Sequence, residues 1–325
     1  MNHSRVIAVY VGLSLATAAI LMLSLTTGTV TLEAAALWHG LAAQDPLAQS
    51  LIFDLRLPRA LTAFAAGGCL ALAGGLMQVL LRNPLADPFV MGVSGGAAAA
   101  ALAAMLIGLS GLGVDAAAAL GALGATLLVF ALAHGDGGWT PTRLLLTGVV
   151  VAAAASAVVS LLLTLGDETQ LRGMLFWLMG DLAFSDRPGP LLALFLAALL
   201  VSFPFARQLN VLARSELQAH TLGAPVEALR IGIFLGSSVL TAASVTTAGT
   251  IGFVGLVTPH LARLLLGADH RRMLPASALL GGMLVMVADL CARTLFAPRQ
   301  LPVGALTAIV GAPLFLALMR RSSAK

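Results

Sequence analysis

The sequence contains few charged residues. Only 10% of its 325 residues are charged, whereas 59% are hydrophobic, and the mean hydropathy is +0.99. A soluble domain is about one quarter charged, and a folded core cannot hide this much apolar surface from water. The scarcity of charge therefore excludes an ordinary soluble protein and predicts an integral membrane protein.

Lysine is nearly absent, because Lys325 is the only one in the chain. A P-loop needs a lysine and a Ser or Thr directly after its last glycine. The glycine-rich stretch with Gly92, Gly95 and Gly96 therefore cannot hold a phosphate in that way. We interpret these glycines as positions where membrane helices approach closely, and we expect any ATP site to lie on another chain.

Catalytic and metal-binding patterns are also lacking. The two cysteines lie in apolar segments and indicate neither a disulfide framework nor a metal site. Asp289 is the only acid well inside an apolar stretch; we interpret it as a partner that orients Arg293, four residues on. The alternative is a proton-carrying acid. His260 follows Pro259 and could cap a broken helix, with a haem or metal ligand as the less favoured reading. We predict no catalytic residue, no metal site and no enzyme.

The sequence does contain long apolar stretches of about 15 to 24 residues. That length suits a membrane-spanning helix, and it lacks the alternation of a spanning β-strand. The first stretch exceeds the usual core of a signal peptide, so we favour a retained helix. We predict an all-α fold of ten spans: 6–25, 61–81, 89–112, 116–133, 144–165, 191–205, 231–245, 251–267, 273–291 and 303–319.

The distribution of arginine predicts the orientation of these spans. With a cytoplasmic N-terminus, twelve basic residues lie inside and six outside, as basic residues prefer cytoplasmic loops. We expect both termini inside, segments 28–59 and 166–189 outside, and the loop 207–230 inside with one or two short helices. A short surface helix could lie in the first outer segment, and 174–182 should pack back on the bundle with Trp177 at the interface. All of residues 1–325 then form one domain.

Several motifs, in order, resemble a known family. They are LRLPRALTAFAAGGCLALAGGLMQVLLRNPLADPFVMGVSGGA, TRLLLTGV, FWLMGDL, AHTLGA, GTIGFVGLVTPHLARLLLGADHRRMLPASALLGG and LPVGALTAIVGAPLF. The chain resembles the permease subunit of a type II ABC importer of the iron-chelate and cobalamin uptake family. The resemblance implies a homodimer of ten-helix subunits with an inverted repeat and a pore on the dimer axis. It also implies two ATPase subunits, which carry ATP and Mg, and a periplasmic or surface binding protein.

The resemblance implies roles for three groups of residues. Arg56, Arg59 and Arg293 would dock the binding protein through its acidic side chains. The segment 215–223 would couple to the ATPase, with a helix resting on lipid as the alternative. Its candidate residues are Ser215, Glu216, Ala219, His220, Leu222 and Gly223. Glu216 and His220 are the exposed polar candidates for this contact.

The cytoplasmic gate is expected at the turn RNPLADP, where Pro84 and Pro88 stop the flanking helices. The resemblance places Asn83, Leu85, Thr140 and Thr142 on the translocation path. Pro141 departs from the small polar residues usual before the fifth span, which puts the second gate layer in question.

The expected cargo is a metal chelate, first ferric siderophore, with haem and cobalamin as alternatives. The expected location is the inner, cytoplasmic membrane. Two other classes stay open from the residues alone: an ion-coupled secondary carrier, and a membrane protein that transports nothing.

Overall fold

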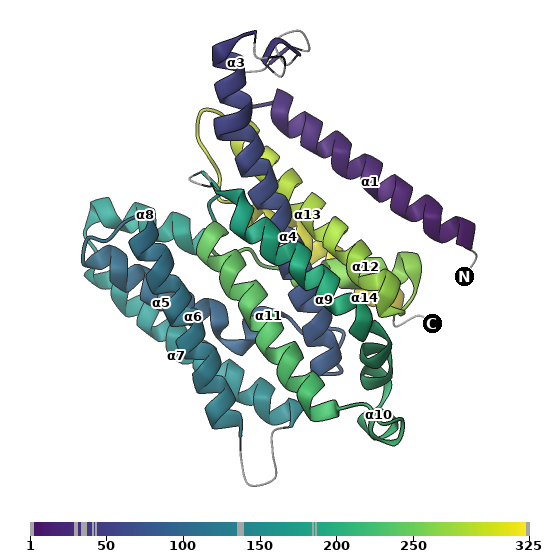
Figure 1. Ribbon diagram of the computed structural model, residues 1–325. Helices are drawn as coiled ribbons and strands as arrows, with labels where there is room; N and C mark the ends of the chain where they lie inside the picture. The colour runs from purple at the N-terminus through teal and green to yellow at the C-terminus, as the bar shows by residue number, and fades with distance from the viewer. Residues whose placement is uncertain are drawn as a thin grey trace.

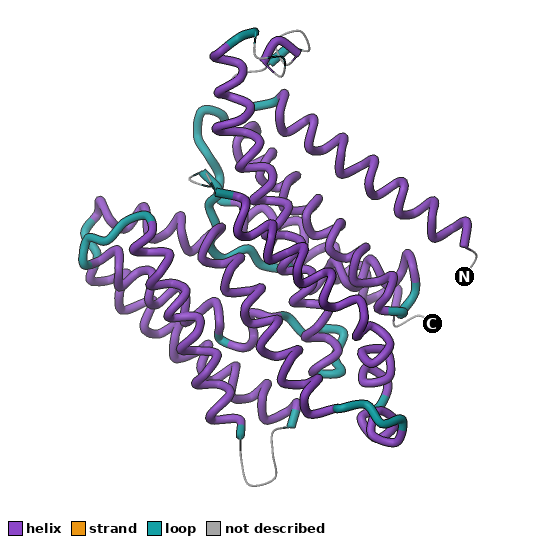
Figure 2. The backbone as a smooth tube through the Cα atoms, viewed as in Figure 1, coloured by secondary structure: helices purple, strands orange, loops and turns teal. Residues whose placement is uncertain are grey.

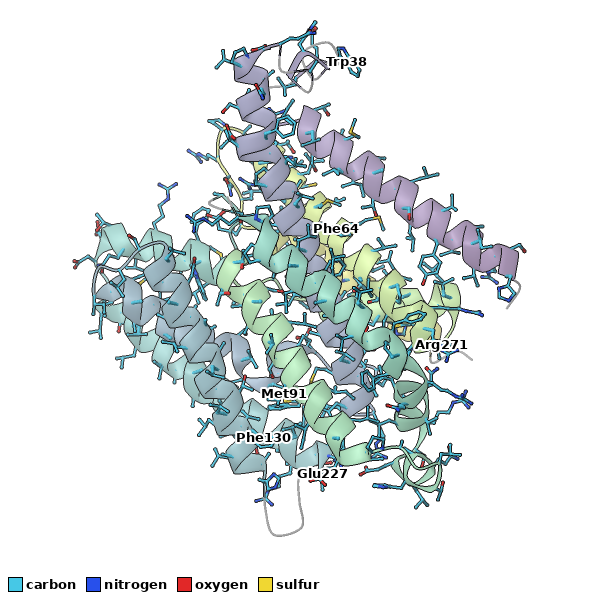
Figure 3. All side chains as sticks on the ribbon, in the orientation of Figure 1. Trp38, Phe64, Met91, Phe130, Glu227 and Arg271 are labelled. Atoms are coloured by element: carbon cyan, nitrogen blue, oxygen red, sulfur yellow. The ribbon has the colours of Figure 1, made fainter. Side chains whose placement is uncertain are left out.

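A computed structural model describes residues 3–28, 32–33, 38–40, 42, 44–134, 140–183, 185 and 187–322. Over these residues the chain is a bundle of helices joined by short loops, without strands (Figures 1 and 2). Figure 3 shows Trp38 at one end of the molecule, and Glu227 at the opposite end, near the short helix α10. The predicted all-α class is confirmed.

The helices run through the chain in the following order. They are α1 (His3–Thr26), α3 (Pro46–Ser50), the π-helix η1 (Leu51–Arg56), α4 (Leu57–Leu80), the 3-10 helix η2 (Pro88–Met91), α5 (Val93–Leu106), α6 (Leu112–Ala133), α7 (Pro141–Leu165), α8 (Glu168–Met179), α9 (Pro188–Arg214), α10 (Glu216–Thr221), α11 (Val226–Ala248), α12 (Val254–Leu266), α13 (His270–Thr294) and α14 (Val303–Ser322).

Nine of the ten predicted spans overlap one helix each, and the span 89–112 falls mainly on two, η2 and α5. In the described ranges, seven helices are long and apolar enough to cross a membrane: α1, the continuous helix Pro46–Leu80, α6, α7, α9, α11 and α13. The shorter apolar helices are α5, α12 and α14. A multi-pass membrane protein is therefore confirmed, whereas the count of ten spans stays a prediction.

The predicted span 89–112 is not one helix, which corrects the sequence interpretation. It consists of η2 and α5, separated by Gly92 with a φ of 75°. Only glycine adopts this left-handed conformation without a steric penalty. Asp87 caps η2 by accepting a hydrogen bond from the Phe89 backbone nitrogen at 2.8 Å. The break leaves α5 with 14 residues.

Two predicted loops are more helical than expected. In the outer segment 28–59, helix begins at Pro46 and continues through η1 into α4. Asp45 caps its start by accepting from the backbone nitrogens of Leu47 and Ala48. In the inner segment 207–230, α9 continues to Arg214 and α11 begins at Val226, so α10 and its flanking turns alone separate them.

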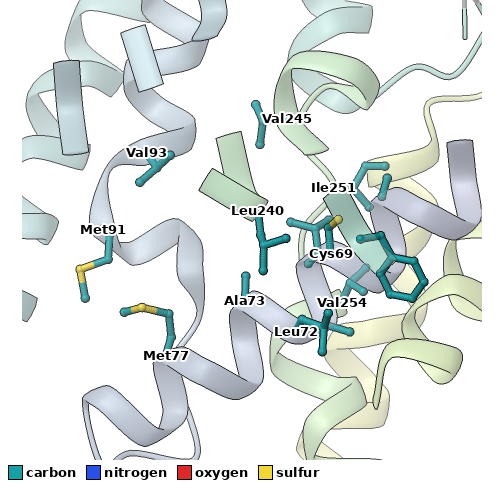
Figure 4. Packing of buried hydrophobic residues seen from close by; sticks show 14 of the residues in the cluster. Cys69, Leu72, Ala73, Met77, Met91, Val93, Leu240, Val245, Ile251 and Val254 are labelled. Atoms are coloured by element: carbon teal, nitrogen blue, oxygen red, sulfur yellow. The ribbon is translucent and has the colours of Figure 1, made fainter. Parts of the chain in front are cut away.

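Helix α4 lies at the centre of the bundle and contacts α13, α11, α9 and α12. Its small side chains allow very close approach. A Cβ at Gly67 would overlap the carbonyl of Gly281 on α13, and one at Gly74 would overlap Gly255 on α12. Figure 4 shows the buried apolar residues that surround this contact, with Cys69 among them. Small residues at helix interfaces are the usual means of membrane helix packing.

The glycine-rich stretch serves the close approach that the sequence predicts. Gly96 faces Gly121 of α6 so closely that a Cβ on either residue would meet the other's carbonyl oxygen. Gly95 lies against Ala155 of α7, and Gly92 lies against Val151. These glycines therefore join α5 to α6 and α7 and are occupied by packing.

Two of the short helices, α5 and α12, each follow a residue with a left-handed backbone conformation. These residues are Gly92 before α5 and Phe253 before α12. Phe253 is the unusual one of the two, because a non-glycine residue rarely adopts positive φ. The predicted inverted repeat stays a prediction. Helix α1 lies at the edge (Figure 1) and is tied to α13 by a Tyr10 hydroxyl that donates to the Arg272 carbonyl at 2.7 Å.

The outer segment 166–189 contains α8, which packs back on the bundle as predicted. Met174 and Leu182 are fully buried, and Trp177 packs against the core. The Val303 nitrogen donates to the Gly180 carbonyl at 3.0 Å, which joins the turn after α8 to the start of α14.

Candidate coupling, docking and gate sites

Arg59 and Asp289 form a largely buried ion pair at one end of the bundle, where α4 begins and α13 ends. The Nε and Nη2 atoms of Arg59 donate to Asp289 Oδ1 at 2.8 and 2.7 Å. The side chains are 14% and 3% exposed. The predicted partner, Arg293, lies 3.7 Å from the other oxygen of the same carboxylate. The i,i+4 pair exists, but Arg59 is the closer partner.

The other two arginines of this cluster bind the end of α1. Arg56 Nη1 donates to the Leu25 carbonyl at 2.6 Å, and Arg293 Nη2 donates to the Ser24 carbonyl at 2.6 Å. The last carbonyls of a helix lack partners within the helix and carry partial negative charge. Both guanidinium groups therefore stabilise the C-terminal end of α1.

The structure thus brings Arg56, Arg59 and Arg293 together, and it gives each a partner inside the subunit. Gln300 extends the cluster, because it lies 3.5 Å from Arg59 and donates to Asp181 at 2.7 Å. The role of the three arginines in docking stays a prediction. Sequence analysis missed the partners of Arg59, because Asp289 and Gln300 lie more than 200 residues from it along the chain.

Glu216 links α10 to two neighbouring elements. Its Oε1 atom accepts from Arg230 of α11 at 2.7 Å, and Oε2 lies 3.7 Å from Arg82 in the RNPLADP turn. Its side chain is 28% exposed. Glu216 was expected as an exposed contact, whereas here it links α10 to two other elements. Ser215 caps α10 by accepting from the Gln218 nitrogen, and Ala219 is buried beneath it.

The outward face of α10 is apolar at two positions. Leu222 and Leu217 are 72% and 74% exposed, with His220 exposed between them. The helix ends in a turn where Gly223 has a φ of 75°. Sequence analysis chose Leu222 but missed Leu217. Two leucines within a polar loop were the available signal, because exposed leucines in such a loop indicate a contact surface.

The RNPLADP turn is held by its own side chains. Asn83 Oδ1 accepts from the Leu85 nitrogen at 2.9 Å, a local turn that Asn favours. Leu85 is 44% exposed, so it is free to face another molecule. Arg82 has a φ of 48°, an uncommon conformation for a residue with a side chain. Burial raises the pKa of the Asp87 carboxyl to about 6, although its side chain remains partly exposed.

The second gate layer lies at the start of α7. Thr140 caps this helix by accepting from the Arg143 nitrogen at 3.2 Å, and Thr142 is exposed in the first turn. Pro141 occupies the first helical position, where a missing N–H costs nothing. The expected turn 139–143 begins at a residue outside the described ranges. The translocation role of both threonines stays a prediction.

A cavity of about 390 Å³ lies between α5, α8 and α14. Its lining carries no charged side chain and consists of Phe89, Ser94, Leu178, Met179, Thr250, Gly252, Gly304 and Ala305. A bare cation needs acids or ordered carbonyl groups in its path. The lining supplies no acidic side chain for a bare cation.

An apolar helix bundle with arginine-rich ends agrees with a multi-pass membrane protein. The chain belongs to the FecCD transport family, which matches residues 7–321. Members of this family are permease subunits of ABC importers and are not enzymes themselves, as the sequence resemblance implied.

Curated relatives show how the family varies in cargo. The chain is 38% identical to the hemin transport system permease HmuU of Yersinia pestis, over 92% of this chain and 91% of the relative. It is 42% identical to the cobalamin import permease BtuC of Halobacterium salinarum, over 84% and 74%. It is 38% identical to the molybdate import permease MolB of Haemophilus influenzae, over 83% and 81%.

A solved structure supports the fold. It is described as an inward-facing conformation of a metal-chelate type ABC transporter, with a TM-score of 0.85 and 35% identity. The match covers 95% of this chain and 98% of that one. The family implies association with ATPase and substrate-binding partners.

Proposed function

We propose that two copies of this chain form the membrane channel of an ATP-driven importer for a metal chelate, with ferric siderophore as the first cargo. The family match over residues 7–321 carries this proposal. It is supported by relatives named for hemin, cobalamin and siderophore transport, because these cargoes are large metal chelates.

The energy comes from two ATPase subunits, which bind ATP and Mg on the cytoplasmic side. Helix α10 is the contact through which their closure reaches the membrane. Arg56, Arg59 and Arg293 face the binding protein on the outer side. Both chain termini lie in the cytoplasm, and the subunit resides in the inner membrane. The arginine distribution and the placement of α10 opposite the arginine cluster support this orientation.

Haem and cobalamin are the alternative cargoes of the same machinery. An ion-coupled carrier is the alternative of another class. It would need a membrane acid that gains and loses a proton, and Asp289 is the candidate. The close pairing of Asp289 with Arg59 favours a fixed structural role, because both carboxylate oxygens accept hydrogen bonds from this guanidinium.

The experiment that tests the proposal is uptake in a strain that lacks this gene. Labelled ferric siderophore, haem, cobalamin and molybdate are offered separately. We expect ferric siderophore uptake to be lost and to be restored by the wild-type gene but not by a version without residues 215–223. If uptake of haem, cobalamin or molybdate is lost instead, that compound is the cargo and ferric siderophore is not. Restoration by the deleted version would contradict ATPase coupling through α10.

A further inference from the structure

A second cavity, of about 510 Å³, opens at the same end of the bundle as α10. It lies where α4, α9 and α12 end and α13 begins. Its lining is polar and rich in arginine: Gln78, Arg82, Asn210, Arg214, Arg263 and Asp269 all contribute. Small-molecule sites have volumes of about 300–1,000 Å³, so the space is sufficient for a ligand group.

Arg263 provides the first indication of what this cavity binds. Its Nη2 atom donates to Gln78 Oε1 at 2.8 Å. Among the residues that the structure describes, no carboxylate lies within ion-pair distance of this guanidinium. A guanidinium carries five N–H donors, and a partly buried charge without a counter-charge is costly. Arg263 is therefore poised to donate to an anion.

Gln78 gives a second and independent indication. Its side chain is 5% exposed, and its Nε2 atom has no hydrogen-bond partner within the described part of the chain. Because Arg263 occupies the amide oxygen, the unpartnered atom is the donor. Buried polar groups without partners are rare in folded proteins. The amide and the guanidinium thus leave donors unused on the same cavity wall.

The charges around the cavity favour an anion. Three arginines line it against one carboxylate, Asp269. Burial raises the pKa of Asp269, but hydrogen bonds from Asn210 and the Arg271 nitrogen, with the charges of Arg271 and Arg272, lower it further, so the group stays ionised. Arg82 reaches Glu216 only at 3.7 Å. Arg214 has no ion pair within the described ranges. The lining therefore keeps a net positive charge.

Side-chain hydrogen bonds fix part of the cavity wall. Asn210 Oδ1 accepts from the His270 backbone nitrogen at 2.8 Å and lies 2.6 Å from His270 Nδ1. Asn210 Nδ2 donates to Asp269 at 2.8 Å. These bonds join the end of α9 to the start of α13. The cavity is consequently held open between elements that are linked to each other.

We propose that this cavity binds a phosphate group through Arg214, Arg263 and Arg82. Phosphate suits donors that converge from several helices, because its oxygens point in different directions and arginine binds it by charge-assisted hydrogen bonds. The group comes from an anionic phospholipid headgroup or from a free phosphate ester. The site does not depend on which cargo crosses the membrane.

The test uses the full-length protein and two probes. In the first arm, purified protein is titrated with inorganic phosphate at constant ionic strength, and the unfolding midpoint is measured against chloride. In the second arm, protein from vesicles of phosphatidylglycerol and phosphatidylcholine is examined by native mass spectrometry for retained lipid. We expect binding in at least one arm. Arg263→Gln or Arg214→Gln should weaken it about tenfold, which corresponds to about 1.4 kcal/mol, because each substitution removes one charged donor.

Arg207→Gln is the matched control. Arg207 is exposed on the same helix as Arg214 and does not line the cavity. We expect this variant to bind like the wild type. If Arg263→Gln fails to fold, Arg214→Gln alone is measured, because Arg214 is exposed and its replacement should leave the fold intact. Binding in the lipid arm alone assigns a headgroup, and binding in the phosphate arm assigns a free ester. Absence of binding in both arms, or an equal loss in Arg207→Gln, would overturn the proposal.

Discussion

The Asp289 carboxylate is the counter-charge of two largely buried arginines, Arg59 and Arg293, so replacing it should destabilise the folded protein. Removing one partner of a buried ion pair leaves an uncompensated charge and destabilises a protein by about 3–5 kcal/mol. For Asp289→Asn we therefore expect a large drop in the unfolding midpoint of the purified protein. Asp54→Asn is the control, because Asp54 is exposed and accepts only from the Ser50 hydroxyl. Equal midpoints for both variants would contradict the structural role of Asp289.

Asp87 should make the stability of the protein depend on pH. Its pKa is raised from 3.8 to about 6 by burial, so the folded state binds a proton more tightly than the unfolded state. Stability is then greatest below pH 4 and falls as pH rises through the window to about 6, by up to about 3 kcal/mol. Asp87→Asn keeps an acceptor for the helix cap and should remove this dependence. Unfolding midpoints measured across the window check it; an unchanged slope in the variant would count against it.

At the residue scale, sequence analysis found the polar residues but not their partners. Asp289 and Arg293 were predicted as a pair because their spacing is local. The closer pair with Arg59 joins residues 230 positions apart, and no periodicity encodes such a contact. The same holds for Glu216, whose exposure was predicted from a polar loop although Arg230 and Arg82 bind it. Long-range ion pairs depend on how helices pack, which a single sequence does not specify.

The close contact between the backbones of α4 and α13 at Gly67 can be tested by substitution. Gly67→Ala should destabilise the protein by at least about 1–3 kcal/mol, because overpacking forces the backbones of α4 and α13 apart. Gly236→Ala on α11 meets nothing within 4 Å. It should instead stabilise slightly, since alanine favours helix by up to about 1 kcal/mol over glycine. Thermal unfolding of both variants checks these opposite signs, and a stabilised Gly67→Ala would refute the close contact.

Helix α10 can be tested through its exposed leucines. Leu217→Ser combined with Leu222→Ser should weaken binding of the ATPase subunits more than tenfold, because each buried leucine contributes about 1.5–3 kcal/mol. The fold should persist, since both side chains are largely exposed in the subunit. Co-purification of the ATPase with the membrane subunit is the measurement. Gln218→Ser on the same helix is the control, and retention of the ATPase by the leucine variant would remove α10 as its contact.

Sequence analysis located every long helix but misjudged several ends. The lengths of the apolar stretches predicted α6, α7 and α13 well, because the thickness of the hydrocarbon core sets the length of a spanning helix. It joined η2 to α5, since neither composition nor hydropathy marks the left-handed residue Gly92. It also ended the sixth span, 191–205, too early, because α9 continues beyond the apolar stretch into polar sequence as far as Arg214. Helix boundaries depend on caps and on packing, whereas hydropathy reports only the membrane-embedded part.

At the scale of the whole molecule, the proposed homodimer predicts a contact between identical turns. Leu85→Cys in both subunits, in a background without Cys291, should form a disulfide in at least one nucleotide state and block uptake. A disulfide requires Cα atoms within about 7 Å. Leu120→Cys on α6 is the control, because Leu120 is 70% exposed and lies away from the turn. Failure of the Leu85 pair to cross-link in every state would place this turn off the dimer axis.

The contacts of α4 restrict how the protein can change shape. At Gly67 and Gly74 the backbone of α4 meets the backbones of α13 and α12, with no side chain between them. Such surfaces cannot slide, because any axial shift would drive a neighbouring side chain into a carbonyl group. We therefore expect α4, α12 and α13 to move together as one rigid body in any conformational change of the subunit. The bending has to occur at pivots outside this unit, and Gly92, the left-handed joint between η2 and α5, is placed to be one of them.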